Sequence, residues 1–375
     1  MIAFTGRALF DLLLPPAARR TAGAVAVALA AALALIACVS EQPLRAWLIL
    51  LTGPLPELRQ GADGAWHWQR LVRFGTVLED TINLTLLGLA VLIPFRARQF
   101  ALGADGQLFL GALAGVAFGL AWPGPGWLAL PLACCAAMLA GGLWGGAAGV
   151  LKWRCGANEM VVSLMLNLIA IECYRLAVSR WLRDPGAGFP ATPFLPPAAV
   201  FDPLIAHTGV GWMLLAAPLA VLAVALLLGR TTLGYEIRVS GAAPAFARQA
   251  GLPVGRAIVM SMALGGALAG LAGFHVGHAL LKRLPVDLAP GLGFEGLLVA
   301  LLARHQPRAI LGAALFYAWL RAGGQAMERS TDVAREIVLV LQALVIVLVM
   351  AERWPWRARG RHWLGRMRAP CGTSA

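Results

Sequence analysis

Charged residues are scarce in this sequence. Asp, Glu, Lys and Arg make up 13% of its 375 residues, against roughly 25% in soluble domains. Only two lysines, Lys152 and Lys282, stand among its 31 basic residues. A soluble fold would have to bury many apolar runs of about 18 or more residues in one core, which ordinary domains do not do. The composition therefore excludes a soluble protein.

Catalytic and nucleotide-binding motifs are also missing. No GxxxxGK[ST], HExxH or GxSxG pattern occurs. The run 291–296 matches GxGxxG, but the rest of a soluble dinucleotide-binding unit does not surround it. A Gly-rich opening to a discontinuous membrane helix fits this run better. The chain is therefore predicted to be no enzyme and no P-loop ATPase, and to hold no cofactor.

The cysteines and histidines show no metal-binding pattern. His275 and His278 are three residues apart and could share a metal, although such a pair at a helix end more often makes ordinary hydrogen bonds. No CxxC spacing occurs, so neither a zinc site nor a disulfide framework is indicated, and we expect buried, core-type thiols. The six cysteines are Cys38, Cys134, Cys135, Cys155, Cys173 and Cys371.

Hydrophobic residues, in contrast, make up 59% of the chain and form long runs. They predict an all-α, polytopic membrane helix bundle with about ten transmembrane helices, some short or discontinuous. The runs 81–95 and 290–304 are short for a bilayer of roughly 30 Å and are expected to be tilted, broken or re-entrant. The expected spans are 22–39, 81–95, 105–121, 127–150, 160–178, 211–229, 257–275, 290–304, 309–325 and 336–351.

A single transmembrane domain over 1–375 is expected, in three parts. Residues 1–79 would provide a first helix and a polar periplasmic loop over 40–79, residues 80–351 the core, and residues 352–375 a basic cytoplasmic tail. The first run ends at Cys38 like a lipoprotein signal, but a chain with many later spans more simply uses it as a signal anchor.

Basic residues set the expected orientation. They gather in alternate loops, which places both termini in the cytoplasm of a bacterial inner membrane. The net charge of +13 is explained by these loops and by contact with anionic membrane lipid, so nucleic acid is not expected as a partner.

Polar residues inside the spans suggest a path for a small polar solute, because such residues are costly in lipid and usually face the bundle interior or water. Ser163 and Asn167 are four residues apart and share a helix face. Interhelical hydrogen bonds that only hold the bundle together are the alternative. The candidate pathway residues are Asn83, Gln107, Ser163, Asn167 and Glu172.

The segment 230–274 joins a basic, Gly- and Pro-broken stretch to a long apolar run. Ser240, Gly241 and Pro244 can start a short helix that carries Phe246, which suits docking to another protein. A basic loop held at the cytoplasmic face is the simpler alternative. The candidate docking residues are Arg238, Gly241, Pro244, Phe246, Ala247, Arg248 and Gly251.

Small residues also recur at four-residue spacing, as in Gly141, Gly145 and Gly149 or in Gly266 and Gly270. This spacing favours close helix packing within one subunit, with sliding at a subunit interface as the alternative.

Four stretches in order resemble a known family, the inner-membrane permeases of ABC importers, in its simple-sugar and nucleoside branch. They are FRARQFALGADGQLFLGALAG at 95–115, GANEMVVSLMLNLIA at 156–170, TTLGYEIRVSGAAPAFARQAGLPVGR at 231–256 and GLGFEGLLVALLARHQP at 291–307. The chain departs from that pattern at Ala101, Asp105, Ala243 and His305.

The resemblance implies that 231–256 contains a coupling helix that sits on a separate ABC ATPase subunit and drives alternating access. It also implies a second permease subunit, in a hetero- or homodimer, and an extracytoplasmic solute-binding protein. A secondary transporter, with Glu172 or Glu295 carrying a coupling proton, and an integral membrane enzyme are the competing hypotheses.

Overall fold

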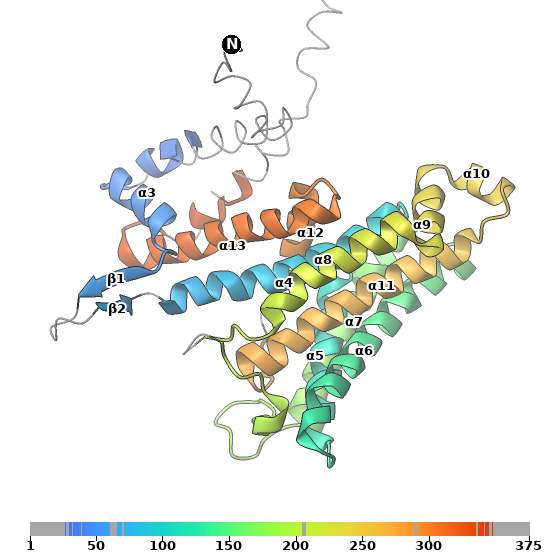
Figure 1. Cartoon of the computed structure of the whole chain (residues 1–375), viewed down its shortest axis with the longest axis horizontal. Coiled ribbons are helices and arrows are strands. Elements are labelled where there is room, and N and C mark those ends of the chain that lie inside the picture. The colour runs from blue at the N-terminus through green and yellow to red at the C-terminus, as the bar shows by residue number, and fades with distance from the viewer. Residues whose placement is uncertain are drawn as a thin grey trace, which may run out of the picture. The chain divides into compact units, whose positions relative to one another are not determined.

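The computed structural model describes residues 40–60, 66–69, 71–204, 208–288 and 291–334, with scattered positions between 27 and 38 and between 337 and 347. Nearly all of its regular structure is helical (Figure 1). Two short strands, β1 (Glu57–Gln60) and β2 (Trp66–Gln69), form an antiparallel hairpin. The chain divides into two compact units, one of 1–47 with 331–375 and one of 48–330.

The larger unit holds the long helices. They are α4 (Leu71–Arg96), α5 (Ala104–Ala121), α6 (Gly126–Cys155), α7 (Glu159–Leu176), α8 (Met213–Arg230), α9 (Thr232–Ala242), α10 (Pro244–Gln249), α11 (Val254–His275), α12 (Leu292–Leu302) and α13 (Pro307–Ser330). A short helix, α3 (Pro43–Thr52), crosses the boundary between the two units. The π-helical turns Ala177–Trp181 and Val276–Leu281 extend α7 and α11.

Six described helices are long and apolar enough to cross a membrane: α4, α5, α6, α7, α8 and α11. The helical membrane bundle is confirmed, but the count of ten is not. The 11 residues of α12 are too few to span, as the short run 290–304 suggested. Helix α13 is long but carries Arg308, Arg321, Glu328 and Arg329. Most of the expected spans 22–39 and 336–351, and all of the tail 352–375, lie outside the described residues.

Helix α4 is the central element of the larger unit, because it packs against α8, α11, α12 and α13. Its residues from Thr81 to Pro94 are all buried, including Leu84, Leu86 and Leu92. Nearby, Phe109 of α5 meets Tyr174 of α7 edge to face, with ring centroids 4.9 Å apart. The Tyr174 hydroxyl donates to the Pro285 carbonyl at 2.6 Å.

Small residues let α5, α6 and α11 approach closely. A Cβ atom added to Gly141 would lie 2.3 Å from the Gly266 carbonyl oxygen, and one added to Gly270 would lie 2.2 Å from that of Ala137. In α5, a Cβ on Gly111 would lie 2.4 Å from the Gly270 Cα. The stripes therefore pack against one another within one subunit, as the simpler interpretation of the spacing predicted.

Two expectations about the N-terminal part are wrong. The run 81–95 is neither short nor broken, because α4 begins at Leu71 and runs for 26 residues. The segment 40–79 is accordingly no simple loop, since it contains α3, the hairpin and the first turns of α4. Polar residues in its first turns made the start of α4 unrecognisable from hydropathy, which counts a carboxylate such as that of Glu79 against a span. In the structure this carboxylate accepts a hydrogen bond from the Gly209 amide.

The expectation of buried thiols is also wrong for most of the described cysteines. Cys38, Cys135, Cys155 and Cys173 are exposed and Cys134 is half-buried, while Cys371 lies outside the described residues. A thiol is apolar enough to face lipid as readily as a protein core, so burial rules taken from soluble proteins fail for such positions.

In the smaller unit, the Asp332 side chain joins the segment after α13 to Ser40 and Glu41. The Ser40 hydroxyl donates to Oδ1 of Asp332 at 2.7 Å, and the Glu41 amide donates to Oδ2 at 2.8 Å. These two hydrogen bonds favour the carboxylate and lower the pKa of Asp332.

Candidate functional site

The segment 101–107, at the start of α5, joins three of the four stretches that resemble the permease family. Its Asp105 side chain accepts hydrogen bonds from the backbone amides of Gly293, at 2.6 Å, and Gly291, at 3.3 Å. These amides open α12, so the carboxylate satisfies donors that the helix itself leaves free and lies at its positive end. Gly291 has φ +112, a conformation that glycine adopts without strain. The Gly-rich opening thus starts a short helix, as predicted.

Helix α7 holds the same segment from the other side. The Ser163 hydroxyl accepts from the Leu102 amide at 3.0 Å, and the Asn167 side-chain oxygen accepts from the Gly106 amide. Both side chains are buried, which confirms that they share one face. The polar atoms of both side chains accept from backbone amides, so Ser163 and Asn167 hold the segment 101–107 against α7.

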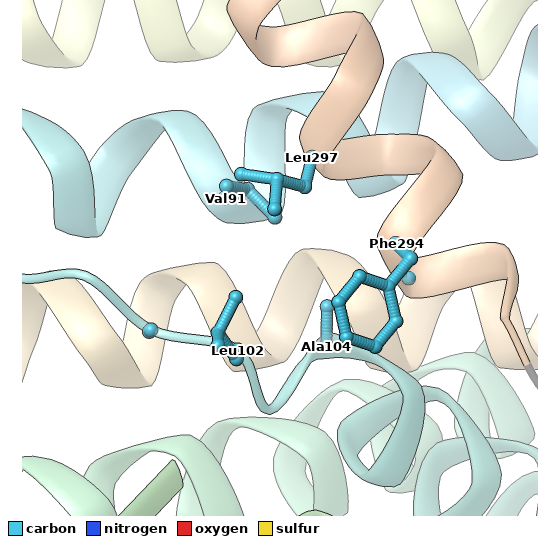
Figure 2. Close-up of a pocket in the computed structure, with 7 residues that line it drawn as sticks. Val91, Leu102, Ala104, Phe294 and Leu297 are labelled. Atoms are coloured by element: carbon cyan, nitrogen blue, oxygen red, sulfur yellow. The ribbon is translucent and has the colours of Figure 1, made fainter. Parts of the chain in front are cut away.

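A small apolar cavity of about 10 Å³ lies where α4, the segment 101–104 and α12 meet (Figure 2). Figure 2 shows Val91 and Leu297 on one side of it and Leu102, Ala104 and Phe294 on the other. The side chains that line it are apolar, and so small a volume leaves room for no solute. The junction is therefore closely packed.

The other candidate pathway residues lie apart from one another. Gln107 is buried, and its Nε2 lies close to Gly145 of α6. Asn83 is buried in α4, where its Oδ1 lies 2.8 Å from Nδ1 of His275. Glu172 instead has an exposed side chain on α7 and pairs with Arg175 at 2.8 Å. Asn83 and Glu172 are thus not brought together with Ser163 and Asn167 by any described contact.

A charged cluster inside the bundle joins α4, α12 and α13. The Arg321 guanidinium lies 2.6 Å from Oε2 of Glu295 and 3.8 Å from Oδ2 of Asp80. Glu295 was among the residues singled out from the sequence, whereas Asp80 and Arg321 were not. The signal was present, because Arg321 interrupts the expected span 309–325 and charges within spans are paired.

The His275 and His278 pair forms no metal site with other residues of the described chain, where no group of three or more His, Cys, Asp or Glu side chains could hold a metal. Both rings are fully buried in the last turn of α11 and its π-helical extension. His278 Nδ1 lies 3.2 Å from the Phe274 carbonyl oxygen, an ordinary contact of a helix end.

The docking residues named from the sequence lie on α9, on α10 and just beyond it, at one end of the larger unit (Figure 1). Pro244 starts α10, as predicted, whereas Ser240 and Gly241 end the preceding helix α9. Gly241 is buried so tightly that an added Cβ would lie 2.1 Å from the Arg96 carbonyl oxygen. Gly251 follows α10 with φ +74.

The side chains of α10 divide into an anchored and a free face. Ala247 is fully buried, whereas Phe246 is 59% exposed. Arg248 is exposed as well, and so is Arg238 on α9. An exposed phenylalanine beside arginines, on a short helix held at its base, has the composition of a protein-binding surface.

The turn between α12 and α13 is tied to the same end. Nε and Nη2 of Arg96 donate to the His305 carbonyl at 3.1 and 2.6 Å, and the His305 ring stacks on Phe95. Burial, and secondarily the Arg96 charge, lower the pKa of His305. His305, where the chain departs from the family pattern, thus joins the turn to the end of α4.

The fold and its ordered motifs define a membrane transport subunit. A family described as branched-chain amino acid transport system / permease component matches residues 74–350, and the chain belongs to this family. It is therefore a permease subunit and not an enzyme.

Curated relatives agree with this assignment. The chain is 33% identical to a glucose ABC transporter permease protein of Haloferax volcanii, over 76% of this chain and 77% of the relative. It is 31% identical to a guanosine ABC transporter permease protein of Bacillus subtilis, over 85% and 92%. A nucleoside ABC transporter permease protein of Lactococcus lactis is 28% identical, over 80% and 88%. No solved structure matches the chain significantly.

These relatives decide between the competing hypotheses. All three are named as permeases of ABC transporters, so an ABC permease is supported and a secondary transporter with a coupling proton on Glu172 or Glu295 is not favoured. Such a permease implies an ATPase and a solute-binding protein as partners.

Proposed function

We propose that the chain is the permease subunit of an ATP-driven importer for nucleosides or simple sugars in a bacterial inner membrane, with both termini in the cytoplasm. Relatives named for guanosine, nucleosides and glucose support the substrate class. A second permease subunit would complete the pore, and a solute-binding protein would deliver the solute from outside.

The observation that carries the proposal is the exposed Phe246 on an α10 whose base is buried. Gly241 packs on the last turn of α4, and Ala247 lies on the buried face of α10. A force on α10 would therefore be transmitted to the bundle. We propose that Phe246, Arg238 and Arg248 contact the ATPase, and that Gly241, Pro244, Ala247 and Gly251 shape the coupling segment.

Charge at position 246 tests this contact. Phe246→Asp places a carboxylate on the proposed apolar contact, and adding Gly241→Pro disrupts α9. Both the single and the double variant should lose co-purification with the ATPase while still inserting in the membrane. Phe194→Asp is the matched control, because Phe194 is 62% exposed but lies in the loop between α7 and α8. Retained co-purification of the Phe246→Asp variant would rule out this coupling surface.

The solute path is proposed to run past Asn83, Gln107, Ser163, Asn167 and Glu172. Four of these are buried polar side chains inside the bundle. Glu172 supports the proposal differently, since an exposed carboxylate among apolar neighbours such as Leu168 and Ile169 is unfavourable against lipid. We infer that this face of α7 meets water or the second permease.

The substrate class is tested on the solute-binding protein that delivers solute to this permease. Calorimetric titration with guanosine, adenosine, glucose and leucine should give tight binding of a nucleoside or a sugar. Tight binding of leucine alone would contradict the proposed substrate class. Uptake that persists without the ATPase and collapses with the proton gradient would instead support a secondary transporter.

A further inference from the structure

We propose that the groove between α8 and the start of α13 binds one anionic phospholipid, with an acyl chain along α8 and the phosphate among arginines. Two adjoining hollows, of about 530 and 260 Å³, form this groove and share Ala225, Gly229 and Arg308. This lipid site goes beyond the transport function proposed above.

The walls of the groove suit an acyl chain. Val221, Leu222 and Leu226 line its larger hollow along α8, the most apolar of the six candidate spans. Gly229 leaves the groove open near its end, since a Cβ added there would meet no atom within 4 Å. An apolar groove on the surface of a membrane span is already in contact with lipid, so an acyl chain needs no water-filled route to reach it.

The mouth of the groove suits a phosphate. Arg230 and Arg308 line the larger hollow, Arg96, Arg238 and Arg308 line the smaller one, and no carboxylate lines either. Arginine presents a planar fork of donors that matches phosphate oxygens. Basic pockets between membrane helices at the cytoplasmic side are the usual form of a headgroup site.

Two of these arginines are held in place and two are free. Arg96 is fixed by its two hydrogen bonds to the His305 carbonyl, and Nε of Arg238 lies 3.4 Å from the Gly234 carbonyl oxygen. Arg230 and Arg308 are exposed and pair with no carboxylate in the part of the chain that the structure describes. Unneutralised charges at the end of an apolar groove favour a lipid with an anionic headgroup over a neutral one.

Native mass spectrometry of the purified full chain tests the site. Phosphatidylglycerol should be retained as one molecule per chain, and phosphatidylcholine should not. Arg230→Gln with Arg308→Gln should weaken phosphatidylglycerol binding about 25-fold, because each arginine near a charged membrane surface contributes about 1 kcal/mol and 1.4 kcal/mol is tenfold. The control is Arg154→Gln with Arg256→Gln, which removes two exposed arginines from the ends of α6 and α11.

A second variant separates lipid binding from loss of charge. Gly229→Leu adds an apolar side chain at the groove, where its Cβ would meet no atom within 4 Å, and replaces a helix glycine by a better helix former. The fold should therefore be kept while lipid retention falls. Unchanged retention in this variant or in the Arg230→Gln, Arg308→Gln pair would overturn the proposal. Retention of phosphatidylcholine equal to that of phosphatidylglycerol would also overturn it. So would a rise in melting temperature with inorganic phosphate as large as that with phosphatidylglycerol, which would indicate a site for a soluble anion.

Discussion

Arg321 is the residue on which the charges inside the bundle depend. It lies 2.6 Å from Glu295 and within 4 Å of Asp80, so a single guanidinium offsets two carboxylates from two other helices. Both members of the closer pair are about three-quarters shielded from solvent. Removing one partner of such a pair leaves an uncompensated charge, which costs more than the pair itself contributes.

We therefore expect Arg321→Met to lower the free energy of unfolding by about 1–3 kcal/mol and Glu295→Gln to lower it less. The double variant should recover part of the Arg321→Met loss, because one unpaired carboxylate is then gone. Thermal unfolding in detergent, followed by tryptophan fluorescence, measures the double-mutant cycle. Additive losses would show that Glu295 and Arg321 do not interact energetically.

For single residues, the sequence predicted which polar side chains matter better than it predicted their hydrogen-bond partners. Ser163 and Asn167 were placed on one face by their spacing, and the structure confirms it. Their partners are the amides of Leu102 and Gly106, and backbone donors carry no sequence signal. Arg321 was overlooked for the opposite reason, since an averaged hydropathy window hides one charge among apolar residues.

Among the elements, helices α6 and α11 show how glycine substitutes for the hydrophobic effect in a membrane. Lipid tails are as apolar as side chains, so helix association depends on close packing. Gly141 meets the Gly266 carbonyl at a distance no side chain tolerates, whereas a Cβ on Gly146 would lie an ordinary 3.4 Å from that of Ala263. The two glycines are on the same helix and differ only in the space around them.

We expect Gly141→Ala to destabilise the chain by about 1–3 kcal/mol, because α6 and α11 must separate to admit the methyl group. Gly146→Ala, its matched control, should be neutral or slightly stabilising, since alanine is the better helix former. Melting temperatures of the two purified variants provide the comparison. Equal melting temperatures would contradict the packing described for these helices.

Element boundaries were predictable where composition changes abruptly. The run 105–121 corresponds to α5 within one residue, because Gly103 directly precedes the helix and Trp122-Pro123 follow it. The start of α4 was missed by ten residues, because Arg73, Glu79 and Asp80 resemble a loop. Those carboxylates find partners in Gly209 and Arg321, which are distant in sequence, so only the tertiary structure explains them.

In the molecule as a whole, the two ends of α8 differ in charge. The end carrying α9 and α10 also carries Arg96, Arg248 and Arg308, besides Lys152, which pairs with Glu159. The loop before α8 is mixed instead, with Arg180, Arg183, Asp184 and Asp202. A single candidate span separates these segments. The proposed topology therefore puts them on opposite sides of the membrane, with the α10 end in the cytoplasm by the positive-inside rule.

Thiol labelling tests this orientation. Arg183→Cys and Arg248→Cys each place one thiol at an exposed arginine, in a background whose native cysteines are replaced by serine and in cells without the partner subunits. A membrane-impermeant maleimide should label the Arg183→Cys variant in intact cells. It should label the Arg248→Cys variant only after the cells are permeabilised. The reverse pattern would place α10 outside, where no ATPase could reach it. Labelling of both from outside would show that α8 does not span, and would remove the basis for an acyl chain lying along it.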